Sequence, residues 1–568
     1  MYSKKLLWVL LVLAAKLWAC PTGKKDSGAN GNTHIVRNLP TWGLNTEGAG
    51  IQGDGVKADE GGSLVFDKDT RMYHMWLPDL SNGLVSKFDL KTGEELARYH
   101  SVIPISCRNG QTPEQKNCSA QPRVNVKINY RPNRTAVDLD GNLWVANDGY
   151  GAGARLSSVT KIAAKLKDCV DRNGDGEIRT SRVKEDGSIV VEESDECVLF
   201  TTPVCGGSLG ANALAISRGA EGSAGDVWVG CYDEQTVYQL DLGNGQIKRG
   251  PIPLGMSPSG ALVDGKQTLW LTNIGAELSL QGVNTQTGEV LSKNAWGQPV
   301  PFKPDIACGR SFGLAVDSQN RVWFAGSAQN HALACFYNPY AAEEGDKWRR
   351  CAFPDKSNNL GIAVGADDHV YMPAGGRLSR FRWNEEAGGC EFSPPEGSEG
   401  GAELSIGAAT GVGFDAEGNP WSIGFNRAAR LHLKTGQREF SAHAPSPHLP
   451  VYHAFSDFTG HQLRHFTAPR GLYQRTIQGC EQASWKSLSW EASVPENTKL
   501  QVYVRVAPSE SEWPAAFRYG PLETSPVDLT ALSLKGKLMR LEFVLLPSED
   551  RKSAPALHAY EMKWACEG

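Results

Sequence analysis

A short phrase of alternating apolar and polar residues recurs along the chain, and it is clearest as AVDLDGNLWVAN at residues 136–147. Each copy has an apolar pair, usually an Asp, a polar turn and then a short alternating strand centred on Trp or Tyr. Alternation with period two predicts β-strands. The central aromatic residues of the copies are Trp76, Trp144, Trp228, Trp270, Trp323, Tyr371 and Trp421.

A second hairpin follows most copies of the phrase. It reads LVSKFDLKTGEELARYH at residues 84–100 and VYQLDLGNGQIKRG at 237–250, where Thr-Gly and Asn-Gly supply the positive φ of a tight turn. Each repeat is therefore expected to form four antiparallel strands. From Trp228 onward the aromatic markers lie 42, 53, 48 and 50 residues apart, and periods of about 40–50 residues are typical of propeller blades. The markers predict a seven-bladed β-propeller over residues 62–445, whose first blade begins with LVFDKD at residues 64–69.

The pattern changes after Pro445. Longer alternating strands follow, such as KLQVYVRVA at residues 499–507 and LMRLEFVLL at 538–546. Such strands without the blade phrase predict a C-terminal β-sandwich, jelly-roll-like, over residues 450–568. The expected fold class is all-β, a seven-bladed β-propeller followed by this sandwich.

Residues 1–20, MYSKKLLWVLLVLAAKLWAC, have a charged start and an apolar run too short to span a bilayer, which is typical of a secretion signal. Their end, LWAC, resembles a bacterial lipobox, in which Cys20 is lipidated. An ordinary signal peptide cleaved nearby is the alternative. Pro21 stands where Asp is associated with inner-membrane retention, so the resemblance implies an outer-membrane lipoprotein. Residues 21–61 are expected to be a tether and entry segment, beginning small and polar.

The net charge is −5, so the overall charge of the chain gives no reason to expect nucleic acid as a partner. The chain contains 13 Cys, and removing Cys20 leaves an even number, which favours disulfides in an exported protein. Local pairing in a repeat architecture suggests bonds between neighbours, although Cys335–Cys351 competes with two of the pairs. The expected pairs are Cys107–Cys118, Cys169–Cys197, Cys205–Cys231, Cys308–Cys335, Cys351–Cys390 and Cys480–Cys566.

The repeats also resemble a known group. The segments NRTAVDLDGNLWVAND (133–148), SSVTKI (157–162) and CVDRNGDGEIRTS (169–181) resemble exported myxobacterial propeller lipoproteins, which are in turn similar to the virginiamycin B lyase (streptogramin lyase) and NHL-type propellers. The resemblance covers roughly residues 62–443. It implies a propeller fold, but it says little about activity because propellers carry many functions.

The segment DRNGDGEIRTSR, in a Cys-flanked insertion at about residues 167–197, matches part of a calcium-binding loop. Asp171, Asn173 and Asp175 stand at positions one, three and five, Gly176 at six, and Glu177 can offer its backbone carbonyl at seven. Arg182 stands at position twelve, where an EF-hand has a bidentate Glu, so a closing carboxylate would come from Glu185, Asp186, Glu192, Glu193 or Asp195. A bound Ca²⁺ is expected to be structural; a solvated acidic turn is the alternative.

A lyase that opens a cyclic ester needs a general base, an acid and a cation that stabilises the enolate-like state. No His and Glu set recurs on consecutive blades, and no catalytic or cofactor-binding residue is assigned. The repeated Asp138, Asp264, Asp317 and Asp415 are expected to bond their own turns rather than a metal.

The leading hypothesis is a surface-anchored binding or scaffold module, attached to the membrane through lipid at Cys20. A divalent-metal-dependent lyase or lactonase-like enzyme, with its site at the channel mouth, is the alternative. A third hypothesis is binding of envelope carbohydrate, or of an envelope protein, through the C-terminal domain. Carbohydrate binding would need exposed, coplanar aromatic side chains there.

Overall fold

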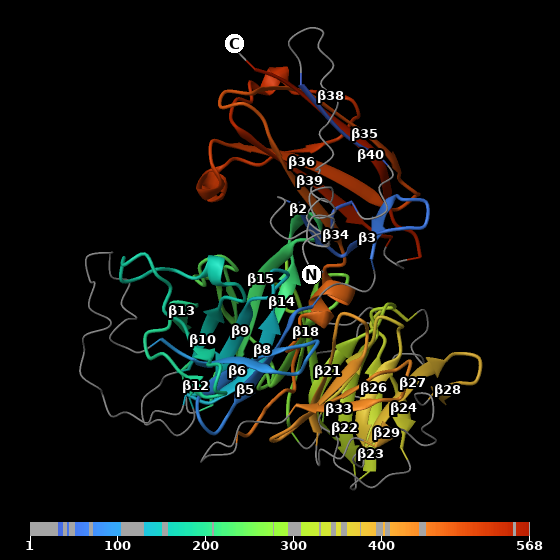
Figure 1. Ribbon diagram of the computed structural model, residues 1–568. Coiled ribbons are helices and arrows are strands. Elements are labelled where there is room, and N and C mark those ends of the chain that lie inside the picture. Colours follow the sequence, from blue (N-terminus) through green and yellow to red (C-terminus); the bar gives the residue numbers. More distant parts are fainter. Residues whose placement is uncertain are drawn as a thin grey trace, which may run out of the picture. The chain divides into compact units, whose positions relative to one another are not determined.

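The computed structural model describes residues 32–37, 42–44, 51–67, 72–103, 130–149, 157–206, 209–275, 278–292, 308–328, 331–341, 348–353, 361–374, 377–393, 402–403, 409–441, 450–548 and 552–566 (Figure 1). These residues are almost entirely in strands and turns. None of the helices they contain is long and apolar enough to cross a membrane.

The chain divides into two compact units. The larger unit is Asp67–Arg470 with Glu549–Lys552; the smaller unit combines Met1–Phe66 with Gly471–Ser548 and Ser553–Gly568. The division therefore lies after Phe66 and Arg470, whereas the sequence predicted boundaries near residues 62 and 445–450. The smaller unit is also discontinuous, which the sequence did not predict.

The larger unit contains a series of antiparallel sheets that follow one another along the chain. Their strands are β5 (His74–Asp79), β6 (Leu84–Asp89) and β7 (Glu95–His100); β8 (Pro132–Val137), β9 (Leu143–Asn147), β10 (Ser158–Ile162) and β13 (Val198–Pro203); β14 (Ala211–Arg218), β15 (Ala224–Cys231), β16 (Thr236–Leu240) and β17 (Ile247–Pro253); β18 (Gly260–Val263), β19 (Thr268–Thr272) and β20 (Leu280–Asn284); β21 (Arg310–Val316), β22 (Val322–Ala328), β23 (His331–Tyr337) and β24 (Trp348–Ala352); β25 (Ala363–Val364), β26 (Val370–Ala374), β27 (Arg377–Asn384), β28 (Gly389–Phe392) and β29 (Ala402–Glu403); and β30 (Ala409–Phe414), β31 (Pro420–Gly424), β32 (Ala428–Leu431) and β33 (Arg438–Ser441). A short hairpin, β11 (Arg182–Val183) with β12 (Ile189–Val190), lies in the insertion between β10 and β13.

The recurring phrase forms the first two strands of most of these sheets. In the clearest copy, Asp138 Oδ1 accepts hydrogen bonds from the backbone N–H of Asp140 at 3.0 Å and of Asn142 at 2.9 Å, which closes the turn. Asp264, Asp317 and Asp415 close their turns in the same way. The prediction that these Asp residues bond their turns is confirmed. The Trp and Tyr markers are buried, with at most 2% of each side chain exposed, so they are core residues of the sheets.

Neighbouring sheets share their cores around a closed ring. The inner strands β8, β14, β18, β21, β25 and β30 lie side by side in that order, and Figure 1 labels the first four of them. The last sheet packs in turn against the first, because Phe414 and Trp421 share a core with Met75 and Phe88. A sheet whose two faces are both covered by neighbouring sheets is the solution expected for radial repetition. The larger unit is therefore a β-propeller scaffold.

The first sheet, β5–β7, takes its inner edge from the far end of the unit. Residues 451–458, here called the closing segment, run antiparallel to β5: Leu80 N donates to Val451 O at 2.9 Å, and Trp76 N donates to Phe458 O at 3.0 Å. The expected first strand of this sheet, residues 64–66, instead forms β4 (Leu64–Phe66) of the smaller unit. The sequence prediction for this strand was wrong because the phrase specifies a strand but not its partner.

The smaller unit contains two antiparallel sheets that bury one core between them. One sheet holds β1 (Asn32–Arg37), β3 (Val56–Ala58), β4, β35 (Ser484–Ser493), β38 (Val527–Asp528) and β40 (Ala556–Ala565); the other holds β2 (Ile51–Asp54), β34 (Gly471–Gln478), β36 (Lys499–Ala507), β37 (Tyr519–Leu522) and β39 (Leu538–Leu546). Strand β1 pairs with β40 from Asn32–Trp564 to Arg37–Ala559. Much of the segment expected to be a tether and entry region is therefore part of a folded sheet.

Helical structure among the described residues is confined to short segments of one or two turns. These are η2 (Leu166–Asp168), η3 (Ala220–Gly222), the π-helical turn η5 (Leu463–Thr467), η6 (Glu510–Ala515) and η7 (Thr530–Leu532).

Five disulfides join Cys169–Cys197, Cys205–Cys231, Cys308–Cys335, Cys351–Cys390 and Cys480–Cys566. These five predicted pairs are confirmed, and the alternative Cys335–Cys351 is not formed. The predicted pair Cys107–Cys118 lies outside the described residues. Disulfides of this number fit a compartment outside the reducing cytosol.

Candidate functional site

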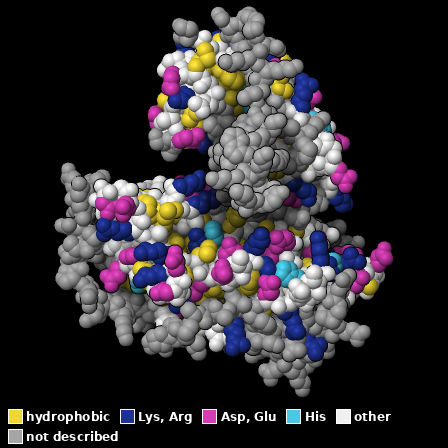
Figure 2. Space-filling view, viewed as in Figure 1, with side chains coloured by type: hydrophobic (Ala, Val, Ile, Leu, Met, Phe, Trp, Pro, Cys, Tyr) yellow, Lys and Arg dark blue, Asp and Glu magenta, His cyan; other side chains and the backbone are white. Residues whose placement is uncertain are grey.

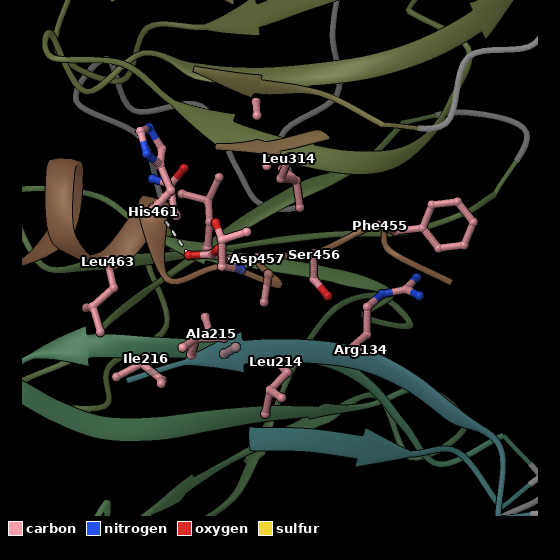
Figure 3. A pocket seen from close by; sticks show the side chains of 18 of the residues that line it. Arg134, Leu214, Ala215, Ile216, Leu314, Phe455, Ser456, Asp457, His461 and Leu463 are labelled. Carbon is pink, nitrogen blue, oxygen red and sulfur yellow. Dashed lines mark hydrogen bonds between the residues drawn. The ribbon is translucent and has the colours of Figure 1, made fainter. Parts of the chain in front are cut away.

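The central channel of the propeller is occupied by the chain itself. Residues 454–467, here called the channel segment, overlap the end of the closing segment and continue through η5. Together with the inner strands they line one cavity, along which Figure 3 shows Arg134, Phe455, Ser456, Asp457 and His461. The lining comes from β8, β14, β18, β21, β25 and β30 as well as from the channel segment. The segment therefore faces nearly every sheet of the ring.

Hydrogen bonds hold the channel segment to the inner strands over its whole length. Ser456 Oγ accepts from Thr135 N at 2.7 Å near one end, and Thr467 Oγ1 donates to Val263 O at 2.6 Å near the other. His461 Nε2 donates to Val364 O at 2.8 Å. Gly411 lies so close to Ala454 O that a Cβ on this glycine would stand 1.9 Å from the oxygen. The segment thus fits the channel as closely as a core strand.

Asp457 organises the turn of this segment. Its carboxylate accepts backbone N–H bonds from Thr459 at 3.1 Å, Gly460 at 2.8 Å and Gln462 at 2.9 Å. Complete burial raises the pKa of the Asp457 carboxyl, and these hydrogen bonds oppose the rise. Because its acceptor sites face the backbone, Asp457 serves the turn and is not placed as a general base.

The space that remains in the channel is small. The cavity has a volume of about 60 Å³, whereas sites for drug-sized ligands occupy about 300–1,000 Å³. A few water molecules fill such a volume. The channel interior therefore has no room for a macrocyclic or sugar substrate.

A polar cluster lies at the end of the channel where the inner strands begin. Arg134 Nε donates to Ser259 O at 2.8 Å, and its NH1 group donates to Asn133 Oδ1 at 2.6 Å. His453 Nδ1 lies 3.3 Å from the same Asn133 oxygen. The Phe455 ring packs against both of these side chains, 5.2 Å from the Arg134 guanidinium and 4.8 Å from the His453 ring.

Burial dominates the electrostatics of this cluster. It lowers the pKa of the His453 imidazole to about 3, and the positive charges of Arg134 and Arg131 add to the effect. Burial also lowers the pKa of Arg134 to about 10, although Asp148 partly compensates. His453 is therefore neutral at physiological pH, and its partners are a neutral amide and an aromatic ring. Among the described contacts, no carboxylate bonds directly to Arg134 or His453.

The calcium-loop motif folds into a network of turns. Asp171 Oδ1 and Oδ2 accept from Gly174 N at 2.6 Å and Gly176 N at 2.9 Å, while Asn173 Oδ1 accepts from Asp175 N at 2.8 Å. Asp175 Oδ2 accepts from the Arg179 guanidinium at 2.7 Å, which together with the Glu177 N–H bond lowers the pKa of Asp175. Glu177 follows at the exposed edge of this turn.

A buried carboxylate that the sequence did not single out closes the loop. Glu196 Oε1 accepts from Arg172 N at 2.9 Å, and its Oε2 accepts from Arg179 N at 2.8 Å. Within the described part of the chain, no three His, Cys, Asp or Glu side chains are grouped to hold a metal ion. The predicted calcium site at Asp171, Asn173, Asp175 and Glu177 thus stays a prediction. Cys20, the predicted lipidation site, lies outside the described residues.

Of the aromatic side chains in the smaller unit that could stack on a sugar (Trp485, Trp490, Trp513 and Tyr519), two are buried and two are partly exposed. Trp485 is 1% exposed and Trp513 is 6% exposed. Phe517 is 69% exposed, but its ring makes an angle of 71° with that of Tyr519. These rings do not form a coplanar platform.

Comparisons with known proteins give a resemblance in fold. No model of a known protein family matches the chain, and no curated protein sequence matches it. Solved structures that resemble it include a streptogramin B lyase, with 14% identity over 69% of this chain and 95% of that chain and a TM-score of 0.35. A catalytically inactive virginiamycin B lyase from Staphylococcus aureus with quinupristin has 13% identity over 69% and 96% of the two chains, with a TM-score of 0.36. The WD40 β-propeller domain of Doa1 has 12% identity over 70% and 90%, with a TM-score of 0.35.

The solved structures that resemble this chain therefore include the streptogramin lyase propellers that the sequence predicted as similar. At these identities it concerns the arrangement of strands and not the chemistry of a site.

The sequence analysis did not identify the channel segment, Arg134 or His453. The segment reads AFSDFTGHQLRHFT and includes Ser, Asp and Gly, which resemble an ordinary loop. One signal was available: Asp457, Thr459 and Gly460 precede Leu463 and Phe466, two apolar residues at helical spacing, as at the start of a helix. Nothing local indicated that this turn would lie inside a channel formed more than 300 residues earlier.

Proposed function

We propose that this protein is a non-catalytic binding or scaffold lipoprotein of the cell envelope. In this proposal a seven-bladed β-propeller and a β-sandwich are carried on the outer membrane by lipid at Cys20. The channel segment supports the non-catalytic part of this proposal, because it fills the space where groups from successive blades would otherwise converge on a substrate. Partner binding is therefore assigned to exposed surfaces.

The surface supports a partner other than nucleic acid. Figure 2 shows Lys and Arg interspersed with Asp and Glu over the face that it presents, without a continuous field of one sign. Nucleic-acid binding generally requires a clustered basic surface. A protein or polymer of the envelope remains the proposed partner class.

The anchoring is tested by fractionating a Gram-negative host that expresses the full chain. The wild-type protein is expected in the outer membrane and should incorporate a labelled fatty acid, while Cys20→Ser should lose both properties. Pro21→Asp is the matched control, because it keeps the lipid but is expected to move the protein to the inner membrane. Equal partition of wild-type and Cys20→Ser protein would overturn the anchor.

The enzyme alternative rests on the polar cluster of Arg134, Asn133 and His453 at the channel mouth. It is tested by incubating the purified protein with quinupristin and Mg²⁺ and following the linearised product by mass spectrometry. The proposal expects no product above the uncatalysed background. Turnover that is lost in His453→Gln would replace the scaffold proposal with a lyase.

A further inference from the structure

One position recurs in every sheet of the propeller, directly across from the aromatic marker on the next strand. Strand register places these residues opposite Trp76, Trp144, Trp228, Trp270, Trp323, Tyr371 and Trp421, in that order: Lys87, Lys161, Gln239, Gly282, Phe336, Arg380 and Arg430. Four of these residues are cations. The position therefore allows a direct comparison of buried charges in equivalent surroundings.

Lys87, Lys161 and Arg430 share the same environment in three respects. Each is less than 10% exposed, and each lies over its marker ring at 5.4, 5.2 and 5.6 Å respectively. Each also donates to a backbone carbonyl of the next sheet, at Ala164 (2.6 Å), Leu242 (2.9 Å) and Lys91 (2.7 Å). The three side chains bridge neighbouring sheets in the same way.

The carboxylate that neutralises the cation differs among the sheets. Lys161 lies 3.4 Å from Asp138, Arg430 lies 3.5 Å from Asp415, and Arg380 lies 2.8 Å from Asp367. Lys87 has no carboxylate within ion-pair distance among the described residues. The reason lies in the topology: in the other sheets the carboxylate follows the first strand of the phrase, and the β5–β7 sheet takes its inner edge from the closing segment instead.

The other charged groups near Lys87 do not replace this partner. His74 on β5 has a pKa lowered to about 3 by burial and by the charges of Lys87 and Lys165, so it is neutral. Lys165 itself adds positive charge. Burial lowers the pKa of Lys87 to about 8, which leaves the amine mostly protonated at neutral pH. A buried ammonium without a counterion is costly unless something pairs with it.

A cavity of about 180 Å³ opens beside Lys87. Its polar lining is Lys87, Lys165, Tyr99, Thr180 and Ser181; Leu96, Ala97, Ala163, Ala164, Leu166 and Cys197 supply apolar surface. The cavity is about three times as large as the one in the channel. Thr180 already donates to Asp195 at 3.0 Å. The cationic donors of the lining are the ammonium groups of Lys87 and Lys165, and of these two only Lys87 is buried.

We propose that this cavity binds a small organic carboxylate, whose anionic group pairs with Lys87 in the place that Asp138 takes beside Lys161. The apolar part of the ligand lies against Leu96, Ala97 and Leu166. A charge-assisted hydrogen bond in a desolvated site is about twice as strong as a neutral one. The cavity volume restricts the ligand to a small acid, because larger ligands need about 300 Å³ or more.

Calorimetric titration of the full-length protein tests this site with benzoate and propionate as probes. Their neutral amides, benzamide and propionamide, serve as matched compounds. Binding of the acids at millimolar or lower concentration, with no binding of the amides, is the expected result. Lys87→Met should weaken acid binding about tenfold or more, whereas Lys248→Met, which removes an equal charge from the exposed surface, should leave it unchanged.

A second measurement needs no variant. Reductive methylation with formaldehyde and cyanoborohydride, read by peptide mass spectrometry, should show benzoate protecting Lys87 and not Lys248. Failure of the wild-type protein to bind either acid would overturn the proposal. Equal binding by wild-type and Lys87→Met protein, or equal methylation of Lys87 with and without benzoate, would also overturn it.

Discussion

The β5–β7 sheet and the sheet that follows it, β8–β9–β10–β13, both pack between neighbouring sheets of the ring, but they obtain their inner strands from different parts of the chain. The second sheet supplies its own inner strand, its own turn Asp and hence the Asp138–Lys161 ion pair. The first sheet takes its inner edge from residues 451–458, and among the described residues no carboxylate lies within ion-pair distance of its buried Lys87. A ring of repeats must close somewhere, and the closing sheet differs from the others because its strands come from distant parts of the chain.

This difference separates local from non-local stability. The second sheet forms from neighbouring residues, whereas the first is complete only when the end of the propeller has folded back. Contacts of high sequence separation carry a larger entropic cost of loop closure. The propeller is therefore expected to open first at the first sheet. Substitutions in the two sheets, acid and chelation of calcium test this expectation, with effects that decrease in that order.

Phe458→Ala truncates one of the two fully buried aromatic side chains of the closing segment. Phe458 is fully buried in the core that joins the last and first sheets, so the substitution should lower the free energy of unfolding by about 3–5 kcal/mol. Urea denaturation followed by Trp fluorescence measures this loss. Phe517→Ala, at a 69% exposed site, is the matched control. A loss below about 1 kcal/mol would show that the ring does not depend on its closing segment.

Lys161→Met and Lys87→Met make the same change in the two sheets. The first leaves the buried Asp138 without its cation, and it should cost about 3 kcal/mol or more. The second removes a buried cation that has no carboxylate partner in the described part of the chain, so the free energy of unfolding in ligand-free buffer should change by about 1 kcal/mol or less. Denaturation of both variants under one condition gives the comparison. Equal losses in the free energy of unfolding would show that Lys87, like Lys161, has an ion-pair partner.

Acid should open the first sheet before the second. Burial lowers the pKa of His74 on β5 and of His453 on the closing segment to about 3, against about 6.5 in an unfolded chain. Below pH 6.5 the unfolded chain binds protons that the folded one does not. Stability is therefore lost as the pH falls from about 6.5 toward 3, by up to about 1.4 kcal/mol per pH unit for each His.

The second sheet and its connections, residues 130–206, contain no His. Hydrogen exchange at pH 7 and pH 5 should show β5 losing protection more than β9. The double variant His74→Gln, His453→Gln should reduce this pH dependence. Equal loss of protection in β5 and β9 would argue against the assignment of acid sensitivity to the first sheet.

The smallest effect is expected from chelation of calcium, and it should be confined to the insertion of the second sheet. If Ca²⁺ binds Asp171, Asn173, Asp175 and the Glu177 carbonyl, EDTA should lower the melting temperature by a few degrees and increase proteolysis within residues 171–196. The Cys169–Cys197 disulfide already ties this loop, which limits the effect. Asp175→Ala should remove the response to EDTA. An unchanged melting curve would favour a turn held by hydrogen bonds alone.

Much of the propeller was predictable because its determinants are local. The Asp138 turn and the Cys169–Cys197 disulfide each join residues within about 30 positions of one another, and the burial of Trp144 follows from the alternation of its own strand. All three features were predicted from the phrase or from Cys spacing. The disulfide Cys480–Cys566 spans 86 residues, yet it too was predicted, because the remaining Cys residues bracket one segment.

The site features were not predictable for the opposite reason. Arg134, His453 and Phe455 meet across about 320 positions of sequence. Residues 64–66 have the pattern of a blade strand, but they pair with Leu557 and Ala556 in the smaller unit. Alternation specifies that a segment is a strand with one buried face; it carries no information about which edge the segment joins.

The sequence alone thus determined the repeated unit: a turn closed by Asp, an aromatic core and a hairpin whose period favours a ring. The tertiary structure alone decided how the ring closes, what fills its channel and which buried cations pair with a turn Asp. The physical reason is that backbone turns and strand patterns are set by neighbours in sequence, whereas burial, channel filling and charge pairing depend on residues that meet only when the last strand is in place.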